Sequence, residues 1–198
     1  AIDSLIAETV EFVRGTLPPT HPYAKVVVTP TGQIQPQTWL LGSSGQSAVW
    51  AAEHGMDYAY AQFFTGRQDT GIMDHYRAHL SDGFPGRTLS AVCVSAAPTR
   101  QEALEQSLMA ANFRVSLGTG RPVTFVTASQ MDAETRSLLT SYVLSNEDTI
   151  FVGDYDEVAD KLTAFQDAHH VDELMLISYI DNVQTKVERY RQLAKRLI

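Results

Sequence analysis

Apolar residues along this chain follow two alternating spacings, which together predict an α/β fold. Short apolar runs suited to buried strands are followed by longer stretches in which apolar positions recur at helical spacing. We place the strands at residues 38–41, 57–63, 89–95 and 173–180. Strand, helix and strand joined by short connections imply parallel strands with right-handed crossovers.

The helices between these strands carry recognisable first residues. The stretch Thr99–Glu102 reads as a capping box that opens a helix running to about residue 117, and Asp154 opens a later helix. Either Asp181 or Asn182 caps the last helix. Between residues 118 and 149 the periodicity weakens, which indicates an insertion before the last strand.

One helix followed by four strand–helix units corresponds to the C-terminal half of a (β/α)8 TIM barrel. We expect residues 1–198 to form a single half-barrel domain that includes the insertion 118–149. A free half-barrel exposes unpaired strand edges, so we expect the N-terminal half of a barrel, or its equivalent, as a partner. The first residue is Ala1 and not Met, which suggests a fragment or a processed chain.

The turn between the first two predicted strands carries the strongest chemical signal. After the strand at residues 38–41 come Gly42, Ser43, Ser44, Gly45, Gln46 and Ser47, and a helix follows. Unpaired backbone N–H groups and the helix dipole favour an anion at such a position, and a phosphate is the natural ligand. An ordinary Ser-capped helix is the alternative, and the turn alone leaves both open.

The longer run Trp39–Phe64 resembles the bacterial luciferase-like flavin-dependent monooxygenases. The resemblance rests on Trp-Leu-Leu-Gly-Ser-Ser-Gly, the small residues of the following helix, and Tyr-Ala-Tyr-Ala-Gln-Phe-Phe. It continues more loosely through Tyr76-Arg77, Thr99–Ala103 and Asp172–Met175. Family members are single-chain barrels of about twice this length, and the part resembled here is the C-terminal half.

The resemblance implies a cofactor and residues that bind it. Reduced FMN, supplied by a reductase, would react with O2 to oxygenate a small organic substrate. Ser44 and Ser47 would bind the FMN phosphate with help from the backbone around Gly45, and Gln62 would lie beside the isoalloxazine ring. The predicted cofactor-binding set is Gly42, Ser43, Ser44, Gly45, Gln46, Ser47 and Gln62. The family's active-site histidine and second phosphate ligand come from the other half, so we name no catalytic residue.

Further expectations follow for the intact protein. The resemblance suggests a homo-oligomer, and the insertion 118–149 is expected to form a mobile lid over the flavin. The alternative for the insertion is a packed surface excursion built on a helix at Ala133–Leu144. Two other functions stay open: a barrel enzyme acting on a sugar phosphate, and a non-catalytic flavin-binding fragment.

The composition of the chain argues against some classes of ligand and predicts a cellular location. Fifteen Lys and Arg against 23 Asp and Glu give a formal net charge of −8, which argues against non-specific nucleic-acid binding. No apolar run is long enough to cross a membrane, and no signal peptide is visible. With Cys93 as its single cysteine the chain has no internal disulfide, so a cytoplasmic location is expected. His75 and His79 lie four residues apart but lack further ligands, so we predict no metal.

Overall fold

The chain divides into two compact units, each of which has its own strands and helices. A computed structural model describes residues 2–29, 35–66, 69–147 and 149–198. The first unit comprises Ala1–Tyr60 and Gly71–Thr88, and the second comprises Ala61–Thr70 and Leu89–Ile198. Within these described ranges, no helix has the length and apolar character needed to span a membrane.

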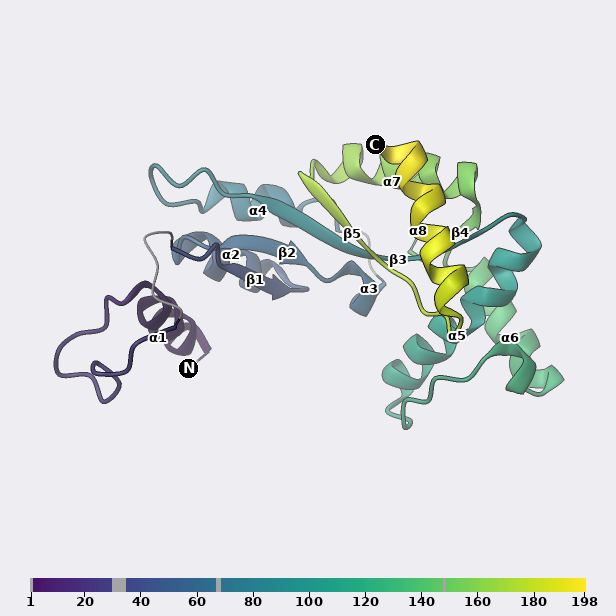
Figure 1. Cartoon of the computed structure of the whole chain (residues 1–198), viewed down its shortest axis with the longest axis horizontal. Coiled ribbons are helices and arrows are strands. Elements are labelled where there is room, and N and C mark those ends of the chain that lie inside the picture. Colours follow the sequence, from purple (N-terminus) through teal and green to yellow (C-terminus); the bar gives the residue numbers. More distant parts are fainter. Residues whose placement is uncertain (1, 30–34, 67–68, 148) are drawn as a thin grey trace. The chain divides into compact units, whose positions relative to one another are not determined.

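The first unit is built around a parallel strand pair. Its elements are α1 (Ile2–Arg14), β1 (Trp39–Gly42), α2 (Gly45–Glu53), β2 (Asp57–Tyr60) and α4 (Ile72–Ala78). In the pair, Trp39 lies opposite Asp57 and Gly42 lies opposite Tyr60. Helix α2 makes the crossover between the strands and packs against α4 (Figure 1). This strand–helix–strand unit confirms the parallel arrangement predicted for it.

Two buried polar groups of the first unit, the Tyr76 hydroxyl and the Asp57 carboxylate, have hydrogen-bond partners near the start of β2. The Tyr76 ring stacks on Tyr58 with 5.7 Å between centroids, and its hydroxyl donates to the Met56 carbonyl at 2.9 Å. The Asp57 carboxylate is 4% exposed and accepts from the Arg87 backbone N–H at 2.7 Å. Pairing of this kind removes most of the cost of burying polar atoms.

The second unit is organised around one long strand. Its elements are α3 (Gln62–Thr65), β3 (Thr88–Ala97, whose first residue belongs to the first unit), α5 (Arg100–Thr119), a 3-10 turn (Ala128–Gln130), α6 (Ala133–Leu144), β4 (Phe151–Asp154), α7 (Tyr155–His169), β5 (Glu173–Ile177) and α8 (Val183–Leu197). Residues Leu89–Cys93 of β3 pair with β5, and Val94–Ala97 pair with β4. Both pairings are parallel, as predicted.

Three details differ from the predicted elements. The last strand was predicted at 173–180, but β5 ends at Ile177. The second strand was predicted at 57–63 but β2 ends at Tyr60, because Gln62–Thr65 forms α3 instead. Strand β4 was not predicted, since it has four residues and one of them is Gly153. A Cβ atom at Gly153 would lie 2.4 Å from the Glu157 Oε2 atom, so a larger residue there would displace the Glu157 carboxylate.

Two apolar clusters cover the two faces of β3 and β4. One joins these strands to α5, the 3-10 turn and α6; its buried members are Ala97, Ala103, Leu108, Ala111, Ala128, Leu139, Val143, Ile150 and Val152. The other joins them to α7 and α8, as in Val92, Val94, Ala96, Phe151, Val158, Leu162, Phe165 and Leu193. Burial also raises the pKa of the Cys93 thiol to about 11, so this cysteine acts as a small apolar residue.

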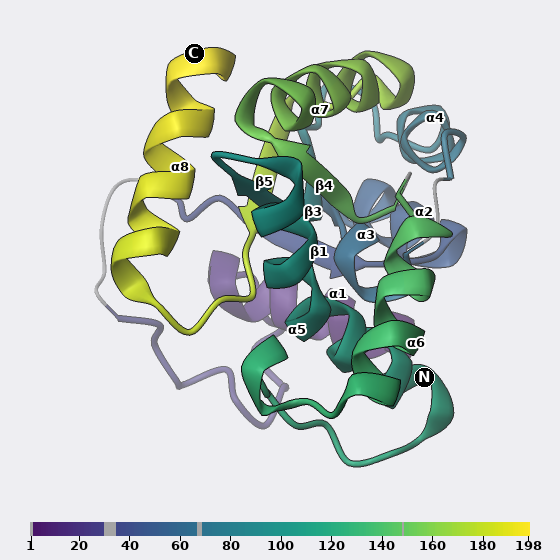
Figure 2. The same ribbon diagram turned by 90° about the vertical axis from the view of Figure 1, so that its right-hand side faces the viewer.

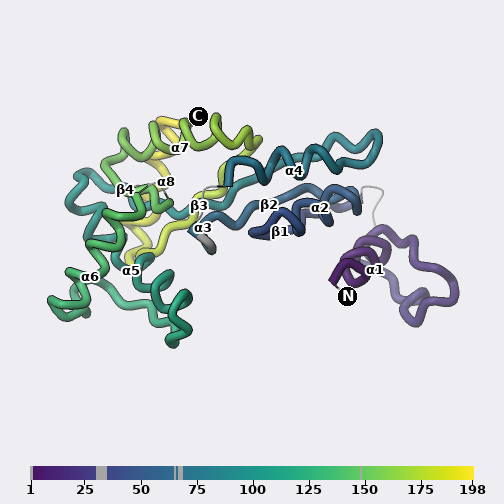
Figure 3. The backbone as a smooth tube through the Cα atoms, turned by 180° about the vertical axis from the view of Figure 1, so that it is seen from behind, coloured from purple at the N-terminus to yellow at the C-terminus, as the bar shows by residue number. Residues whose placement is uncertain are grey.

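The insertion 118–149, of which residue 148 lies outside the described residues, has two parts. Helix α6 lies beside α5 (Figure 2) and buries Leu139 and Val143 in the cluster described above. Residues 121–125, in the connection between these helices (Figure 3), are all exposed. That the insertion forms a lid over the flavin stays a prediction. Because α6 is packed on α5, the mobile part of such a lid would be limited to the connection between these helices.

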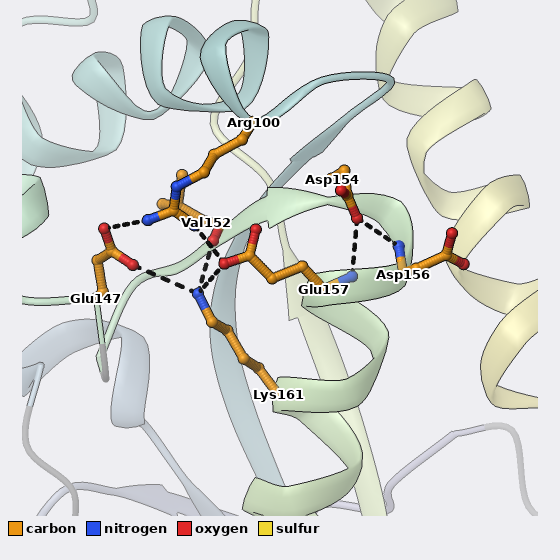
Figure 4. Close-up of polar contacts among 7 residues, drawn as sticks. All are labelled: Arg100, Glu147, Val152, Asp154, Asp156, Glu157 and Lys161. Carbon is orange, nitrogen blue, oxygen red and sulfur yellow. Dashed lines mark hydrogen bonds and ion pairs between the residues drawn. The ribbon is translucent and has the colours of Figure 1, made fainter.

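Charged side chains hold the end of this insertion. Arg100 pairs with Glu147 and with Glu157, while Lys161 lies 3.0 Å from Glu157 and 3.5 Å from Glu147 (Figure 4). The Lys161 ammonium also donates to the Val152 carbonyl at 2.9 Å. Four alternating charges in a closed network fix Glu147 against α5 and α7 more firmly than one surface pair would.

We predict a sharp contrast in amide exchange within the insertion. Residues 137–144 should exchange slowly because their helix is packed on α5. The N–H groups of residues 123–125 should exchange rapidly, because they have no backbone hydrogen-bond acceptor among the described residues. Hydrogen–deuterium exchange with mass spectrometry measures both segments in one experiment. Rapid exchange across α6 would contradict the packed assignment.

A second prediction concerns His169, which is 1% exposed at the end of α7. Burial lowers the pKa of its imidazole, so protonation favours the unfolded chain. The free energy of unfolding should therefore fall as pH drops below about 6.5, by up to about 1.4 kcal/mol per pH unit from this group. Urea unfolding at several pH values, compared with His169→Gln, measures the effect. Identical pH dependence in both proteins would contradict it.

Candidate functional site

The predicted phosphate turn forms a compact cap on α2. The Ser44 Oγ accepts from the Ser47 backbone N–H at 3.3 Å, and the Ser44 N–H donates to the Ser47 Oγ at 3.2 Å. The Ser47 hydroxyl donates in turn to the Ser44 carbonyl at 2.7 Å. These reciprocal bonds make a capping box with serine at both positions.

Gly42 is required by the close approach of β1 to this cap. A Cβ atom at Gly42 would lie 2.1 Å from the Ser47 Oγ and 2.4 Å from its Cβ, which no side chain can tolerate. The Tyr58 hydroxyl contacts the Ser47 Oγ at 3.2 Å and donates to the Ser44 carbonyl at 3.3 Å. Strand β2 thus stabilises the turn through the Tyr58 hydroxyl.

Two backbone donors stay available at the start of α2. Among the described residues, the N–H groups of Gly45 and Gln46 have no hydrogen-bond acceptor. The Ser44 and Gln46 side chains are exposed and Ser43 is half-buried, so solvent reaches this end of the helix. The helix carries no acidic residue in its first turn, which leaves the positive end of its dipole uncompensated. An anion is the ligand that this arrangement favours.

Gln62 belongs to the second unit and is fully buried there. Its Nε2 donates to the Thr149 carbonyl at 3.0 Å, while its Oε1 has no hydrogen-bond partner among the described residues. The Arg114 guanidinium donates to the same carbonyl at 3.0 Å and to the Phe63 carbonyl at 3.2 Å. An orphaned buried acceptor is unusual and marks Gln62 as a residue that a donor group would satisfy.

The structure brings six of the seven predicted cofactor-binding residues together in one turn. The role of the seventh, Gln62, stays a prediction. Two residues near the turn were not predicted to belong to it: Tyr58, described above, and His75, whose Cδ2 would lie 3.4 Å from a Cβ at Gly45. No sequence signal identifies either, because Tyr58 reaches the turn through the pairing of β2 with β1, and His75 through the packing of α4 on α2.

His75 and His79 do not form part of a larger ligand cluster in the described chain. Their rings lie 4.8 Å apart, and the His79 Nδ1 is 2.8 Å from the His75 carbonyl oxygen. Within the described residues, no group of three or more His, Cys, Asp and Glu side chains is placed to hold a metal ion.

We predict that Gly42→Ala destabilises the protein by roughly 1–3 kcal/mol, because the added methyl overlaps Ser47. The double variant Gly42→Ala with Ser47→Gly should recover part of this loss, since it removes the overlapping atoms. Gly118→Ala is the matched control, because a Cβ there meets nothing within 4 Å. Denaturant unfolding compares the variants. Equal stability of Gly42→Ala and Gly118→Ala would refute the steric argument.

Comparison with known proteins places these features in context. No protein-family model matches the chain. It is 28% identical to N-acetyl-S-alkylcysteine monooxygenase of Bacillus subtilis strain 168, over 99% of this chain and 60% of that protein. This chain therefore spans less than two thirds of that relative's length.

Solved structures show the same relationship. The chain matches apo-MsnO8 with a TM-score of 0.74 and 28% identity, over 99% of this chain and 61% of that one. It shares its fold with the oxygenating constituent of 3,6-diketocamphane monooxygenase of Pseudomonas putida, a type II Baeyer–Villiger monooxygenase solved with FMN. That match has a TM-score of 0.52 and 15% identity over 82% of this chain and 48% of that one.

The α/β fold with parallel strands agrees with these neighbours. The matches to a curated monooxygenase and to apo-MsnO8 extend over nearly the whole chain, far beyond the run Trp39–Phe64 that carries the sequence resemblance. Together they confirm that resemblance: over nearly its whole length this chain is similar to luciferase-like monooxygenases.

Proposed function

We propose that this chain is the C-terminal part of a luciferase-like flavin monooxygenase, which uses reduced FMN and O2 to oxygenate a small organic substrate. In this proposal its strands form half of a TIM barrel, and strands from outside the 198 residues complete it. A reductase would supply the reduced flavin, and the intact enzyme would be a homo-oligomer.

The turn from Gly42 to Ser47 is the observation that carries the proposal. Two N–H groups that have no acceptor among the described residues, an uncompensated helix dipole and the weakly held Ser44 hydroxyl suit the phosphate of FMN. Because a side chain at Gly42 would overlap Ser47, β1 can approach the turn closely only with glycine at this position. The residues present therefore fit the phosphate group.

The ring of the flavin is the second group to be accommodated. The buried Gln62 Oε1, which has no partner among the described residues, suits an N–H donor such as the one on the flavin ring. This supports the predicted place of Gln62 beside the isoalloxazine. Its Nε2 is already held by the Thr149 carbonyl, so the orientation of the amide is fixed.

The residues of this chain would bind and shield, and the cofactor would supply the redox chemistry. Reduced flavin, when bound, provides the electrons that activate dioxygen. Ser44 and the N–H groups of Gly45 and Gln46 would hold the phosphate and thereby orient the cofactor. The exposed connection at residues 121–125 would be the mobile part of the proposed lid, which excludes water.

The two alternatives have weaker support. A sugar-phosphate enzyme would also use the turn, but the curated relative named above is a monooxygenase. A non-catalytic flavin-binding fragment explains the turn equally well. It differs from our proposal in one measurable property, because the full-length protein would bind FMN without forming an oxygenated product when reduced flavin, O2 and substrate are supplied.

We predict that Ser44→Asp weakens FMN binding to the full-length protein by at least about thirtyfold, which corresponds to about 2 kcal/mol. Aspartate caps helices as well as serine does, so α2 should stay intact while the added carboxylate repels the phosphate. Quenching of flavin fluorescence during titration gives the dissociation constant.

Ser44→Asn is the matched control, because asparagine is an equally good cap without charge. It should bind FMN far more tightly than Ser44→Asp does. If Ser44→Asp binds FMN as the wild type does, the phosphate is not held at this turn.

A further inference from the structure

The second unit contains a polar cavity whose lining includes none of the predicted flavin residues. It has a volume of about 670 Å³ and is bordered by α5, the 3-10 turn, the segment after β5 and the first turns of α8. Phe125, Ser129, Ser178, Tyr179, Asp181 and Lys186 are among its lining residues. A smaller cavity of about 320 Å³ shares several of these residues and adds Gln106.

A buried positive charge, that of Arg189, contacts one of the residues that line this cavity, Ser178. Arg189 of α8 is 0% exposed, and its Nε and Nη1 donate to the Ala96 and Val94 carbonyls at 2.8 and 3.2 Å. It also donates to the Ser178 hydroxyl and to the Gln106 Oε1. All four acceptors are neutral, and no carboxylate among the described residues pairs with Arg189.

This guanidinium determines which groups the cavity wall offers to a ligand. Arginine has only donors, so Ser178 and Gln106 must turn their acceptor oxygens toward Arg189. The Ser178 O–H and the Gln106 NH2 are then left as donors, and neither has an acceptor among the described residues. A hydroxyl that accepts from a cation is a stronger donor than a free one.

The remaining charges around the cavity leave it positive on this side. The Glu105 carboxylate is paired with Arg136, and the lining of the larger cavity holds one carboxylate, Asp181, and one ammonium group, Lys186. The charge of Arg189 is the one left over. Because the N-terminus of α8 begins beside Asp181, its dipole adds to the positive potential.

The cavity lining also contains two aromatic residues, Phe125 and Tyr179. The rings of Phe113, Phe125 and Tyr179 lie within 5.1–6.0 Å of one another and are nearly parallel. Phe125 is 60% exposed, so much of its ring is open to a ligand. A planar apolar group can stack on this surface.

We propose that this cavity binds an aromatic carboxylate. The ring of the ligand lies against Phe125 and Tyr179, and its carboxylate accepts from Ser178 and Lys186, all of which line the larger cavity. The proposal does not rest on flavin binding, since none of the predicted flavin residues lines the cavity.

Calorimetric titration of the full-length protein with two matched probes tests the proposal without flavin. The probes are 2-naphthoate and its uncharged analogue 2-naphthamide. We expect 2-naphthoate to bind at least about tenfold more tightly, because charge-assisted hydrogen bonds are about twice as strong as neutral ones. Absence of binding by 2-naphthoate and by benzoate at millimolar concentration, or equal affinity for the two probes, would overturn it.

Surface variants then locate the site. Lys186→Gln should weaken 2-naphthoate binding several-fold and leave 2-naphthamide unaffected, whereas Phe125→Ala should weaken both. Lys195→Gln, also in α8 but outside the cavity lining, is the control and should change neither. If Lys195→Gln weakens 2-naphthoate as much as Lys186→Gln does, the anion is held by general charge and the cavity assignment is wrong.

Discussion

The second unit depends on the complete burial of β3. All ten residues of this strand are buried, so each of its backbone polar groups must find a partner within the protein. Strand β5 pairs only with Leu89–Cys93, and β4 pairs with the later residues. Carbonyls of alternate residues point to the same edge of a strand, and those of Val94 and Ala96 are taken by Arg189. The Arg189 side chain thus supplies hydrogen-bond donors to carbonyls of β3 that lie beyond the residues paired with β5.

Placing a charge there has a cost that shapes its surroundings. Burial lowers the pKa of Arg189, since the charged form loses its hydration. The charge is retained because an arginine cannot give up its proton under ordinary conditions. Its remaining N–H groups donate to the Ser178 hydroxyl and the Gln106 Oε1, and these hydrogen bonds determine the polarity of the neighbouring cavity. Arg189 therefore has two effects: it completes the hydrogen bonds of the sheet backbone, and it determines the polarity of the neighbouring cavity.

How much of this the sequence could predict depends on the distance over which each interaction acts. Caps are local, and Thr99, Asp154 and Asn182 accept from N–H groups two or three residues away, as the patterns predicted. The parallel strands and the serine turn were predicted on the same basis. Arg189 is different, because it bonds a carbonyl 95 residues earlier in the chain. No local pattern distinguishes such an arginine from a surface one.

The serine turn shows why local prediction of a cap does not by itself define a binding site. The Ser47 hydroxyl is committed to the Ser44 carbonyl at 2.7 Å, whereas the Ser44 hydroxyl reaches only the Ser47 Oγ at 3.3 Å. A phosphate can recruit the weakly held Ser44 proton at little cost, but would have to break a good bond to recruit that of Ser47. The two serines are therefore unequal, although the sequence presents them as a pair. Ser47 maintains the turn, and Ser44 with the N–H groups of Gly45 and Gln46 is left to meet the anion.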